Sequence, residues 1–421
     1  MWKLPVKQSY TDYFLVTLMY CISGNPAFTA TYPLGKIVNG LFLIILLAVT
    51  GFRVERQAMK TSFIWTAFLC VIFAVQFIQF RQITVLGSLN YIVKMLCAIL
   101  FASYMRRRLQ HAAINVMAVV CAISLPLYLL NLAGVLIPAP IDTDGSELSL
   151  KLNSILIYTQ NLAEFARNGP YRNSGMFWEP GAFAGYIIAT FLLFVDNPEL
   201  IWRRYRKQSI LLVTGLLTTM STTGYILFFV FLLYVIFKLR VFGRSKAYAF
   251  LLAGAVIVLG IVVFNRVDFL GEKIRKELSV SETLTENDAD PSRTGSIIFD
   301  LQYILSNPLF GNGMMPETRF RYHLGLYTEE QLSGFGNGFS GSIASMGLLF
   351  MLAYLISIGL NRSLRAKWFV ILTVILLLQG EYFLNYPFFL AFPFIHFGER
   401  LHAKARSKKV KLVWDRTASN A

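Results

Sequence analysis

Long apolar stretches recur along the whole chain, and short polar or basic segments separate them. A helix needs about 20 predominantly apolar residues to cross a hydrocarbon core of roughly 30 Å. Most of the stretches come close to this length, so the pattern predicts an all-α polytopic membrane protein with about twelve transmembrane helices. The predicted spans are residues 11–24, 36–52, 61–80, 84–104, 112–137, 177–195, 209–220, 223–238, 247–264, 337–360, 367–379 and 384–398.

Basic residues cluster after every second predicted span and account for most of the net charge of +16. The positive-inside rule places such clusters on the cytoplasmic face of a membrane. Both termini then lie in the cytoplasm, the second as a basic tail over residues 399–421. No basic stripe with interleaved aromatic residues stands in a soluble domain, so we expect no nucleic-acid partner. The clusters before the tail are Arg53, Arg56 and Lys60; Arg106, Arg107 and Arg108; Arg203, Arg204, Arg206 and Lys207; Lys238, Arg240, Arg244 and Lys246; and Arg362, Arg365 and Lys367.

The face opposite the basic clusters carries two long segments. Residues 138–176 form an external loop that ends in a charged lip, and residues 265–336 form a large external loop between spans nine and ten. Both contain acidic residues, and no Gly-rich phosphate loop ending in Lys-Ser or Lys-Thr occurs in the sequence. We expect residues 1–421 to form a single integral membrane domain whose sizeable non-membrane mass lies outside the cytoplasm.

Residues 209–238 form one apolar run that hydroxyl-bearing residues and Gly224 interrupt near its middle. Basic clusters flank both ends, and two spans keep both clusters on one face, whereas one span would separate them. Each arm of such a short hairpin is roughly 18 Å long, well short of the roughly 30 Å core. The turn is then expected at membrane depth, where protein or water must surround it. A single long tilted helix is the alternative.

The lip, residues 172–181, places Arg172 and Glu179 at the mouth of a long apolar helix. Lipid solvates charges badly, so charges at such a position indicate a functional site. Pro180 and Gly181 mark the change from irregular chain to helix, because proline suits the first helical turn. The segment therefore predicts a charged rim over a membrane cavity.

Four motifs follow one another along the chain: the lip, a Ser-Thr-rich turn, a large loop with an early arginine, a proline and a Gly-x-Gly pair, and a span that begins at an asparagine. In order, spacing and topology they resemble the O-antigen polymerase and ligase superfamily, which includes Wzy-type polymerases and WaaL-type ligases. The resemblance covers residues 170–350 by motif and the whole chain by its pattern of spans. The motif residues are Arg172, Gly175, Phe177, Glu179, Pro180 and Gly181; Ser221 to Gly224; Arg293, Pro308, Gly311 and Gly313; and Asn337, Ser345 and Gly347.

One departure from the family pattern bears on the reaction. Ligases usually carry a histidine next to the asparagine that opens the span after the large loop, but Gly336 stands there in this chain. The nearest histidine is His323, earlier in the loop. The Glu-Pro-Gly ending of the lip also resembles capsule and exopolysaccharide polymerases more than ligases. Both points favour a polymerase.

The resemblance implies a polysaccharide polymerase of O-antigen or capsule type, acting on the periplasmic face of a bacterial inner membrane. It would transfer a glycan from undecaprenyl diphosphate to a hydroxyl of another lipid-linked repeat unit. The leaving group is a diphosphate, so catalysis mainly needs cations aimed at its developing negative charge. Arginine suits this task, because its guanidinium binds phosphate oxygens bidentately and stays charged.

Four external arginines are candidates to bind the diphosphate. Arg172 and Arg293 match family positions and are also the leading catalytic candidates. The start of a helix at Arg293 would add free amide groups for an anion. Arg319 and Arg321, late in the large loop, rank below them. A solvated surface charge is the alternative for each of the four.

The attacking hydroxyl needs a base or an acceptor that orients it, and Glu179 and His323 are the candidates. Glu179 could instead form an ion pair with Arg172, and His323 could be an ordinary loop histidine. Trp178 and Tyr171 are candidates to stack on a sugar ring and so to bind the glycan.

The expected partners are an undecaprenyl-diphosphate-linked oligosaccharide, the lipid bilayer and a regulator of chain length. We expect no cofactor and no metal. Asp288 and Asp290 have the spacing of a metal-binding carboxylate pair, but Asp290 before Pro291 is more simply a helix N-cap. The alternative functions are an O-antigen ligase that transfers glycan to lipid A core and a transporter or flippase for lipid-linked glycans, which a chain of twelve spans also suits.

Overall fold

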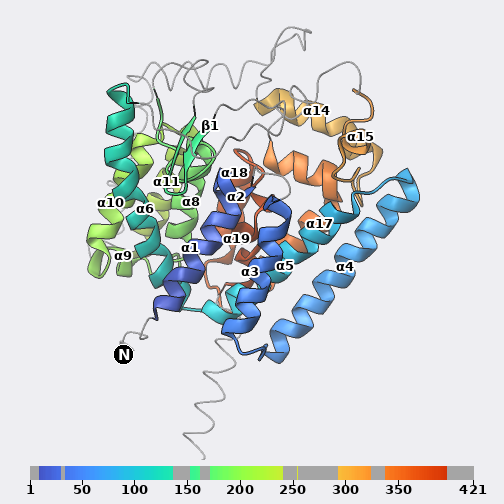
Figure 1. Ribbon diagram of the computed structural model, residues 1–421, viewed down its shortest axis with the longest axis horizontal. Helices are drawn as coiled ribbons and strands as arrows, with labels where there is room; N and C mark the ends of the chain where they lie inside the picture. The colour runs from blue at the N-terminus through green and yellow to red at the C-terminus, as the bar shows by residue number, and fades with distance from the viewer. Residues whose placement is uncertain are drawn as a thin grey trace, which may run out of the picture.

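The computed structural model describes residues 9–29, 34–135, 152–161, 171–239, 254, 293–323 and 337–395. Most of both external loops, the ninth predicted span apart from Gly254, and the basic tail lie outside the described residues. Helices predominate in the described part of the chain (Figure 1). They are α1 (Tyr10–Gly24), α2 (Pro26–Thr29), α3 (Leu34–Val49), α4 (Arg56–Phe80), α5 (Val85–Met105), α6 (Arg108–Leu132), α8 (Pro180–Leu192), α9 (Glu199–Arg203), α10 (Arg206–Thr218), α11 (Thr222–Leu239), α14 (Arg293–Ser306), α15 (Pro316–Arg319), α17 (Gly338–Leu360), α18 (Lys367–Leu378) and α19 (Pro387–Leu390), with short 3-10 helices η1 (Phe383–Asn385) and η2 (Phe392–Phe394).

Four helices in the described residues, α4, α5, α6 and α17, are long and apolar enough to cross a membrane. Shorter apolar helices, including α8 and α18, accompany them. Large apolar side chains also lie on the outer surface of the bundle; Phe63 of α4, for example, is 75% exposed. Such a surface suits contact with lipid. The chain is therefore a helical membrane protein, as the apolar pattern predicts, while the number of spans stays a prediction.

The basic clusters that the structure describes lie at one end of the helical body, the lower end in Figure 1. Arg106 after α5 forms an ion pair of 2.6 Å with Glu55 before α4. The backbone N–H of Arg365, before α18, donates to the carboxylate of Asp196, after α8. The common position agrees with the alternation of charge along the sequence. The compartment that this end faces stays a prediction.

The run over 209–238 contains two helices, α10 and α11. The turn between them has Met220 at φ 48°, and Tyr225 in the first turn of α11 donates to the carbonyl of Leu217 at 2.6 Å. A single straight helix would not contain such a turn. Whether the turn lies at membrane depth stays a prediction.

Helix α17 is interrupted at Gly347, whose φ of 86° suits glycine. The interruption frees backbone groups, and residues 308–313 of the large loop pair with them: Asn312 N–H donates to Ala344 O at 2.8 Å, and Leu348 N–H donates to Pro308 O at 2.8 Å. A Cβ at Gly347 would lie 2.1 Å from Leu309 O. The loop segment after α14 is thus joined to the membrane domain by backbone hydrogen bonds.

The last predicted span, residues 384–398, is wrong as a continuous helix. Its described part consists of η1, α19 and η2. Helix α19 begins at Pro387 and η2 contains Pro393, and proline lacks the N–H donor that a continuous helix needs. This broken segment still runs the length of α17, because Glu381 approaches Gly338 and Ile395 accepts a hydrogen bond from Asn361. Side chains from other helices donate to its carbonyls: Tyr91 to Leu384, Tyr354 to Phe389, and Asn361 to Pro393 and Ile395.

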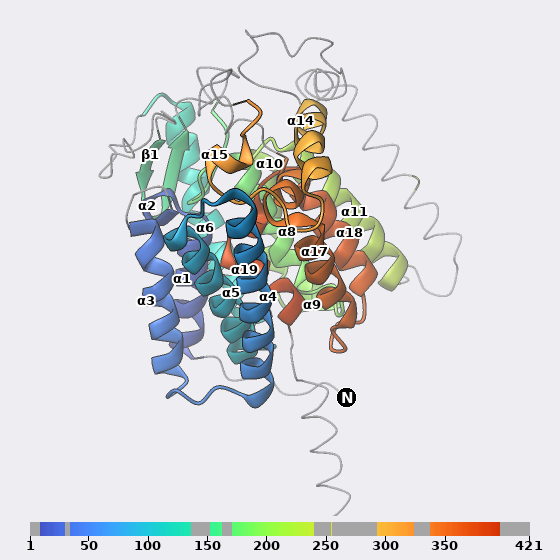
Figure 2. The same ribbon diagram turned by 90° about the vertical axis from the view of Figure 1, so that its right-hand side faces the viewer.

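The broken segment lies in the middle of the helical body (Figure 2). Phe388, Phe389 and Leu390 are each at most 2% exposed, so protein surrounds the irregular backbone on all sides. Irregular backbone at membrane depth is stable only under such cover. The aromatic rings of Tyr186 and Phe389, with centroids 4.9 Å apart, connect the broken segment to α8.

A small antiparallel sheet was not expected in the first external loop. Strand β1 (Leu152–Ile155) pairs with β2 (Tyr158–Asn161) in a register that sets Leu152 opposite Asn161. Asn25 at the end of α1 donates to Leu156 O at 2.8 Å, and Thr159 N–H donates to Gly175 O at 2.7 Å. The sheet therefore anchors the lip to the end of α1.

Candidate functional site

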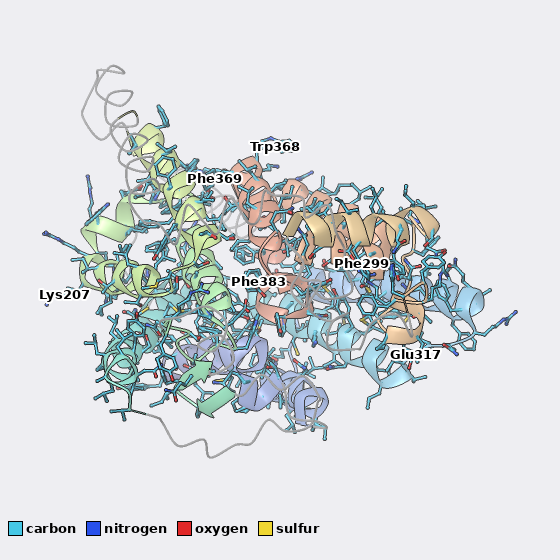
Figure 3. The ribbon with its side chains drawn as sticks, turned by 90° about the horizontal axis from the view of Figure 1, so that it is seen from above. Lys207, Phe299, Glu317, Trp368, Phe369 and Phe383 are labelled. Carbon is cyan, nitrogen blue, oxygen red and sulfur yellow. The ribbon has the colours of Figure 1, made fainter. Side chains whose placement is uncertain are left out.

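The candidate site lies at the end of the helical body opposite the described basic clusters (Figure 1). The lip, the turn between α10 and α11, the first turns of α8 and α17, and the turn after α18 meet there. Figure 3 shows this end from above, with Phe383 near the middle and α14 and α15, marked by Phe299 and Glu317, to one side of it.

Arg172 lies on the turn between α10 and α11. Its Nε donates to Thr219 O at 2.9 Å, and its Nη2 donates to Met220 O at 3.1 Å. The neighbouring Asn173 donates its backbone N–H to Thr218 O at 3.0 Å and its side-chain amide to Thr218 Oγ1 at 2.9 Å. A cation suits this position, because the last carbonyls of α10 carry partial negative charge. The lip and the hydroxyl-rich turn are thus one structural unit.

Two carboxylates meet at the first turn of α8. A Cβ built on Gly181 would lie 3.1 Å from Oε1 of Glu179 and 3.2 Å from Oε1 of Glu381. The Glu179 side chain does not cap its own helix, although its backbone carbonyl accepts from Phe183 N–H. Both carboxylates therefore point to one small region at the positive end of α8.

The indole ring of Trp178 stacks on Tyr386, with ring centroids 4.7 Å apart and an angle of 30° between the planes. Trp178 is half-buried, and so is Tyr171 beside Arg172. The two aromatic candidates thus lie on the lip with part of each side chain accessible, as stacking on a sugar would require.

A buried ion pair connects α14, α15 and α17. Asp300 on α14 accepts from Arg319 Nη2 and, at 2.6 Å, from Ser340 Oγ. Arg319 Nε donates to Ser345 Oγ at 3.1 Å. The Asp300 side chain is fully buried, and that of Arg319 is 4% exposed. Burial raises the pKa of Asp300 above its ordinary value, while the charge of Arg319 opposes that shift.

Tyr382 lies beside this ion pair. Burial, and next the charge of Asp300, raise the pKa of Tyr382 to about 12, while the charge of Arg319 lowers it. The turn that carries Tyr382 packs against the first turn of α17, where a Cβ at Gly338 would lie 1.9 Å from Glu381 O. Asn337 caps α17 by accepting from two backbone N–H groups and donates its amide to Gln379 Oε1 at 2.9 Å. Glu381 and Tyr382 therefore link the carboxylate pair to the ion pair.

The same turn reaches the hairpin that holds Arg172. A Cβ at Gly380 would lie 3.5 Å from Cγ2 of Thr223, in the first turn of α11. Residues 379–382 thus lie between the hairpin turn on one side and α17 on the other. The lip, the hairpin and the ion pair form one continuous polar region at this end of the molecule.

His323 belongs to the α14 side of the region. Its Nδ1 hydrogen-bonds the hydroxyl of Tyr303 at 2.7 Å, and its ring packs on Phe299 with centroids 4.6 Å apart. Burial lowers the pKa of His323, which favours the neutral ring that can accept a proton. Arg321 lies over the rings of Phe80 and Tyr322 at 5.2 and 4.6 Å.

The candidate residues thus fall into two groups. Arg172, Glu179, Trp178 and Tyr171 lie on the lip, whereas Arg319, Arg321 and His323 lie near α14 and α15. Helix α14 begins at Arg293, as its predicted place at a helix start requires, but the side chain of Arg293 lies outside the described part of the structure. Arg319 is already neutralised by Asp300, so its geometry suits positioning better than direct contact with a diphosphate.

The sequence reasoning missed two acidic residues. Glu381 is an isolated acid between two apolar stretches, and that isolation was the available signal. Asp300 gives a weaker signal, because an acid in an amphipathic helix is usually solvated and its partner Arg319 is distant in sequence. Recognising either role required knowledge of the tertiary contacts.

No group of three or more histidine, cysteine, aspartate or glutamate side chains suited to a metal ion occurs among the residues that the structure describes. Comparison of the chain with family models, with curated proteins and with solved structures found no match.

Proposed function

We propose that the chain is a polysaccharide polymerase that joins lipid-linked repeat units on the periplasmic face of a bacterial inner membrane. The observation that carries the proposal is the meeting of Glu179 and Glu381 at the start of α8, beside the hairpin turn that holds Arg172. Carboxylates that can accept a proton and a cation that can meet a diphosphate occur together at one end of a membrane domain. The resemblance of the motifs to Wzy-type polymerases supports the same function.

The proposed topology has twelve spans, both termini in the cytoplasm and a large periplasmic loop over residues 265–336. The common position of the described basic clusters supports it, since these clusters favour the cytoplasmic side. In this orientation the broken segment from Glu381 to Ile395 serves as the last crossing, although it is not a regular helix. The candidate site then faces the periplasm.

The proposed reaction is a displacement at the anomeric carbon of the donor glycan. A hydroxyl oxygen of the acceptor repeat unit bonds to that carbon, and the bond from the carbon to the diphosphate oxygen breaks. The hydroxyl proton passes to a base, and undecaprenyl diphosphate leaves with the bonding electrons. The donor already contains the activated bond, so the reaction needs no nucleoside triphosphate.

Glu179 and Glu381 are the proposed proton acceptor and its neighbour, which orients the acceptor hydroxyl. Arg172 stabilises the diphosphate as its charge develops, with Arg293 at the start of α14 as the second cation. The hydrogen bonds of Arg172 to Thr219 and Met220 fix its position, which reduces the reorganisation that charge stabilisation would otherwise require.

Arg319 and His323 have supporting roles in this proposal. Arg319, with Asp300, holds the middle of α14 against α17. His323 is the alternative base, because its neutral ring is favoured. Trp178 and Tyr171 provide aromatic faces for the glycan at the lip.

Deletion of the gene and complementation with variants test the proposal. A polymerase deletion leaves single repeat units on the final acceptor, a ligase deletion leaves bare acceptor with accumulated lipid-linked polymer, and a flippase deletion traps units in the cytoplasmic leaflet. Unchanged long-chain polymer after deletion would refute the proposal, and either of the other two patterns would replace it.

Glu381→Gln is the most informative variant, because glutamine keeps the size of the side chain and removes the carboxylate. We expect loss of chain extension with normal insertion of the protein. Glu317→Gln is the matched control, since Glu317 is an exposed acid on α15 at the same end of the molecule. Normal polymer with Glu381→Gln would remove Glu381 from the catalytic group.

A further inference from the structure

A polar cavity lies at the basic end of the molecule, opposite the candidate site. It has a volume of about 300 Å³ and lies between the end of α3 and the end of α5. Leu46 and Leu100 form apolar parts of its wall, and Arg53, Arg106 and Arg108 supply cations. Its volume is at the lower limit for small-molecule sites, which suits a ligand the size of a phosphate-bearing headgroup.

The charges around the cavity favour an anion. Glu55 also lines it, but Glu55 is paired with Arg106 at 2.6 Å. Arg108 is paired at 2.8 Å with Asp12, whose side chain is fully buried. No side-chain partner of Arg53 occurs among the described residues, so the group has an excess of one positive charge, located on Arg53.

Two of the three cations of the wall, Arg106 and Arg108, are held in place before any ligand binds. Arg106 Nε donates to Ser103 O at 3.1 Å, and Arg108 Nη2 donates to Tyr104 O at 2.6 Å. The guanidinium of Arg108 also lies 4.5 Å from the centre of the Tyr104 ring. A preformed group of this kind loses little side-chain entropy when it binds an anion.

The turn that carries Arg53 is also well defined. It follows α3 with Gly51 at φ 59° and Phe52 at φ 57°, and Phe52 N–H donates back to Leu47 O at 2.8 Å. The Phe52 side chain is 73% exposed. On α3 itself, Ile44 is 60% exposed. Apolar side chains that suit acyl chains thus lie close in sequence to the cations of the cavity.

We propose that this cavity binds the phosphate group of an anionic phospholipid at the basic face of the membrane. Arg53 supplies the main attraction, Arg106 and Arg108 shape the wall, and the acyl chains lie along the exposed apolar surface of α3. Basic pockets between transmembrane helices bind anionic headgroups in this way. A free phosphate has the same chemistry, and the experiment below separates the two sources.

Full-length protein in a neutral detergent is titrated with phosphatidylglycerol, with phosphatidylcholine and with inorganic phosphate, and binding is measured by native mass spectrometry and thermal shift. We expect tighter binding of phosphatidylglycerol than of phosphatidylcholine. Arg53→Gln should weaken phosphatidylglycerol binding about five-fold, the effect of one basic residue near a membrane anion. Glu55→Gln should strengthen it, because it removes a negative charge from the wall.

Arg56→Gln is the matched control, since Arg56 is exposed three residues further along the chain and does not line the cavity. Equal weakening by Arg53→Gln and Arg56→Gln would indicate general surface attraction and would overturn the proposal. Equal affinity for the two lipids, together with no binding of inorganic phosphate, would also overturn it. Binding of inorganic phosphate that depends on Arg53, without preference between the lipids, would support the site and identify the ligand as a soluble phosphate. Thermal unfolding without added ligand checks that each variant is folded.

Discussion

The ion pair between Asp300 and Arg319 allows a quantitative test of the link between the large loop and the membrane domain. Replacing Arg319 by methionine keeps an unbranched side chain of similar length and removes the charge. Asp300 then stays in a fully buried position without its cationic partner. Removing one partner of a buried ion pair typically costs about 3–5 kcal/mol of the free energy of unfolding.

The remaining contacts of Asp300 decide where in that range the loss of free energy of unfolding falls. Ser340 Oγ still donates to the carboxylate at 2.6 Å, and a hydrogen bond to a charged group contributes about 1.5–3 kcal/mol. We therefore expect Arg319→Met to lower the free energy of unfolding by about 3 kcal/mol, at the low end of the range. The double change of Arg319→Met with Asp300→Leu should cost less than Arg319→Met alone, because no unpaired charge stays buried.

The loss should depend on pH with a defined sign. Burial already raises the pKa of Asp300, and Arg319 opposes that shift, so the pKa rises further when Arg319 is removed. A carboxyl group whose pKa is higher in the folded than in the unfolded state favours folding at low pH, and this contribution is lost as the pH rises through the folded-state pKa. Arg319→Met should therefore be less destabilising at pH 5 than at pH 8.

Unfolding of purified protein in mixed micelles, followed by tryptophan fluorescence at both pH values, measures these effects. Arg321→Met is the matched control, because Arg321 is less buried and stacks on the rings of Phe80 and Tyr322. Loss of that stacking should cost about 0.5–1 kcal/mol. If Arg319→Met and Arg321→Met cost the same, or if the cost of Arg319→Met is equal at both pH values, the reasoning from burial and charge is refuted.

Three further changes test the site and the loop. Arg172→Lys should reduce polymer chain extension at least about ten-fold in a gel assay of complemented cells, because lysine cannot make both hydrogen bonds, to Thr219 O and Met220 O, that fix the cation. Activity equal to wild type would show that this two-point fixation is not needed. Glu179→Gln should lower the rate of sugar transfer by purified protein by about 100-fold without weakening donor binding, as loss of a proton acceptor predicts; a change in donor affinity alone would argue against that role. Gly347→Ala should lower the free energy of unfolding in micelles by about 2–3 kcal/mol, because it combines a φ of 86° with a Cβ 2.1 Å from Leu309 O; an unchanged unfolding midpoint would contradict the described kink.

The helices whose apolar stretches reach bilayer length could be predicted from the sequence. Helices α4, α5, α6 and α17 coincide with predicted spans to within a few residues at most ends. The start of α8 at Pro180 and the break between α10 and α11 could also be predicted from the sequence, because proline and clusters of hydroxyl residues act through local backbone chemistry. The charge alternation predicted that the basic clusters share one end.

The broken segment from Glu381 to Ile395 could not be predicted in the same way. Its apolar composition fits a helix, and its two prolines alone do not show what would satisfy the carbonyls that they free. The donors Tyr91, Tyr354 and Asn361 come from other parts of the sequence and become partners only after packing. The partnership of Glu179 with Glu381 depends on the same packing, since about 200 residues separate the two acids in the chain.

The kink in α17 and the ion pair of Asp300 and Arg319 act together on α14. A straight α17 would keep its backbone groups within the helix and would offer no partners to residues 308–313. Because Gly347 interrupts the helix, the segment after α14 is fixed by backbone hydrogen bonds, while the ion pair of Asp300 and Arg319 fixes α14 through its side chains. Two independent sets of contacts, at Asp300 and at residues 308–313, therefore hold α14 and the segment after it against α17. A catalytic role for Arg293 requires this rigidity, because a cation can stabilise a leaving diphosphate only if its distance from the base is set before the reaction.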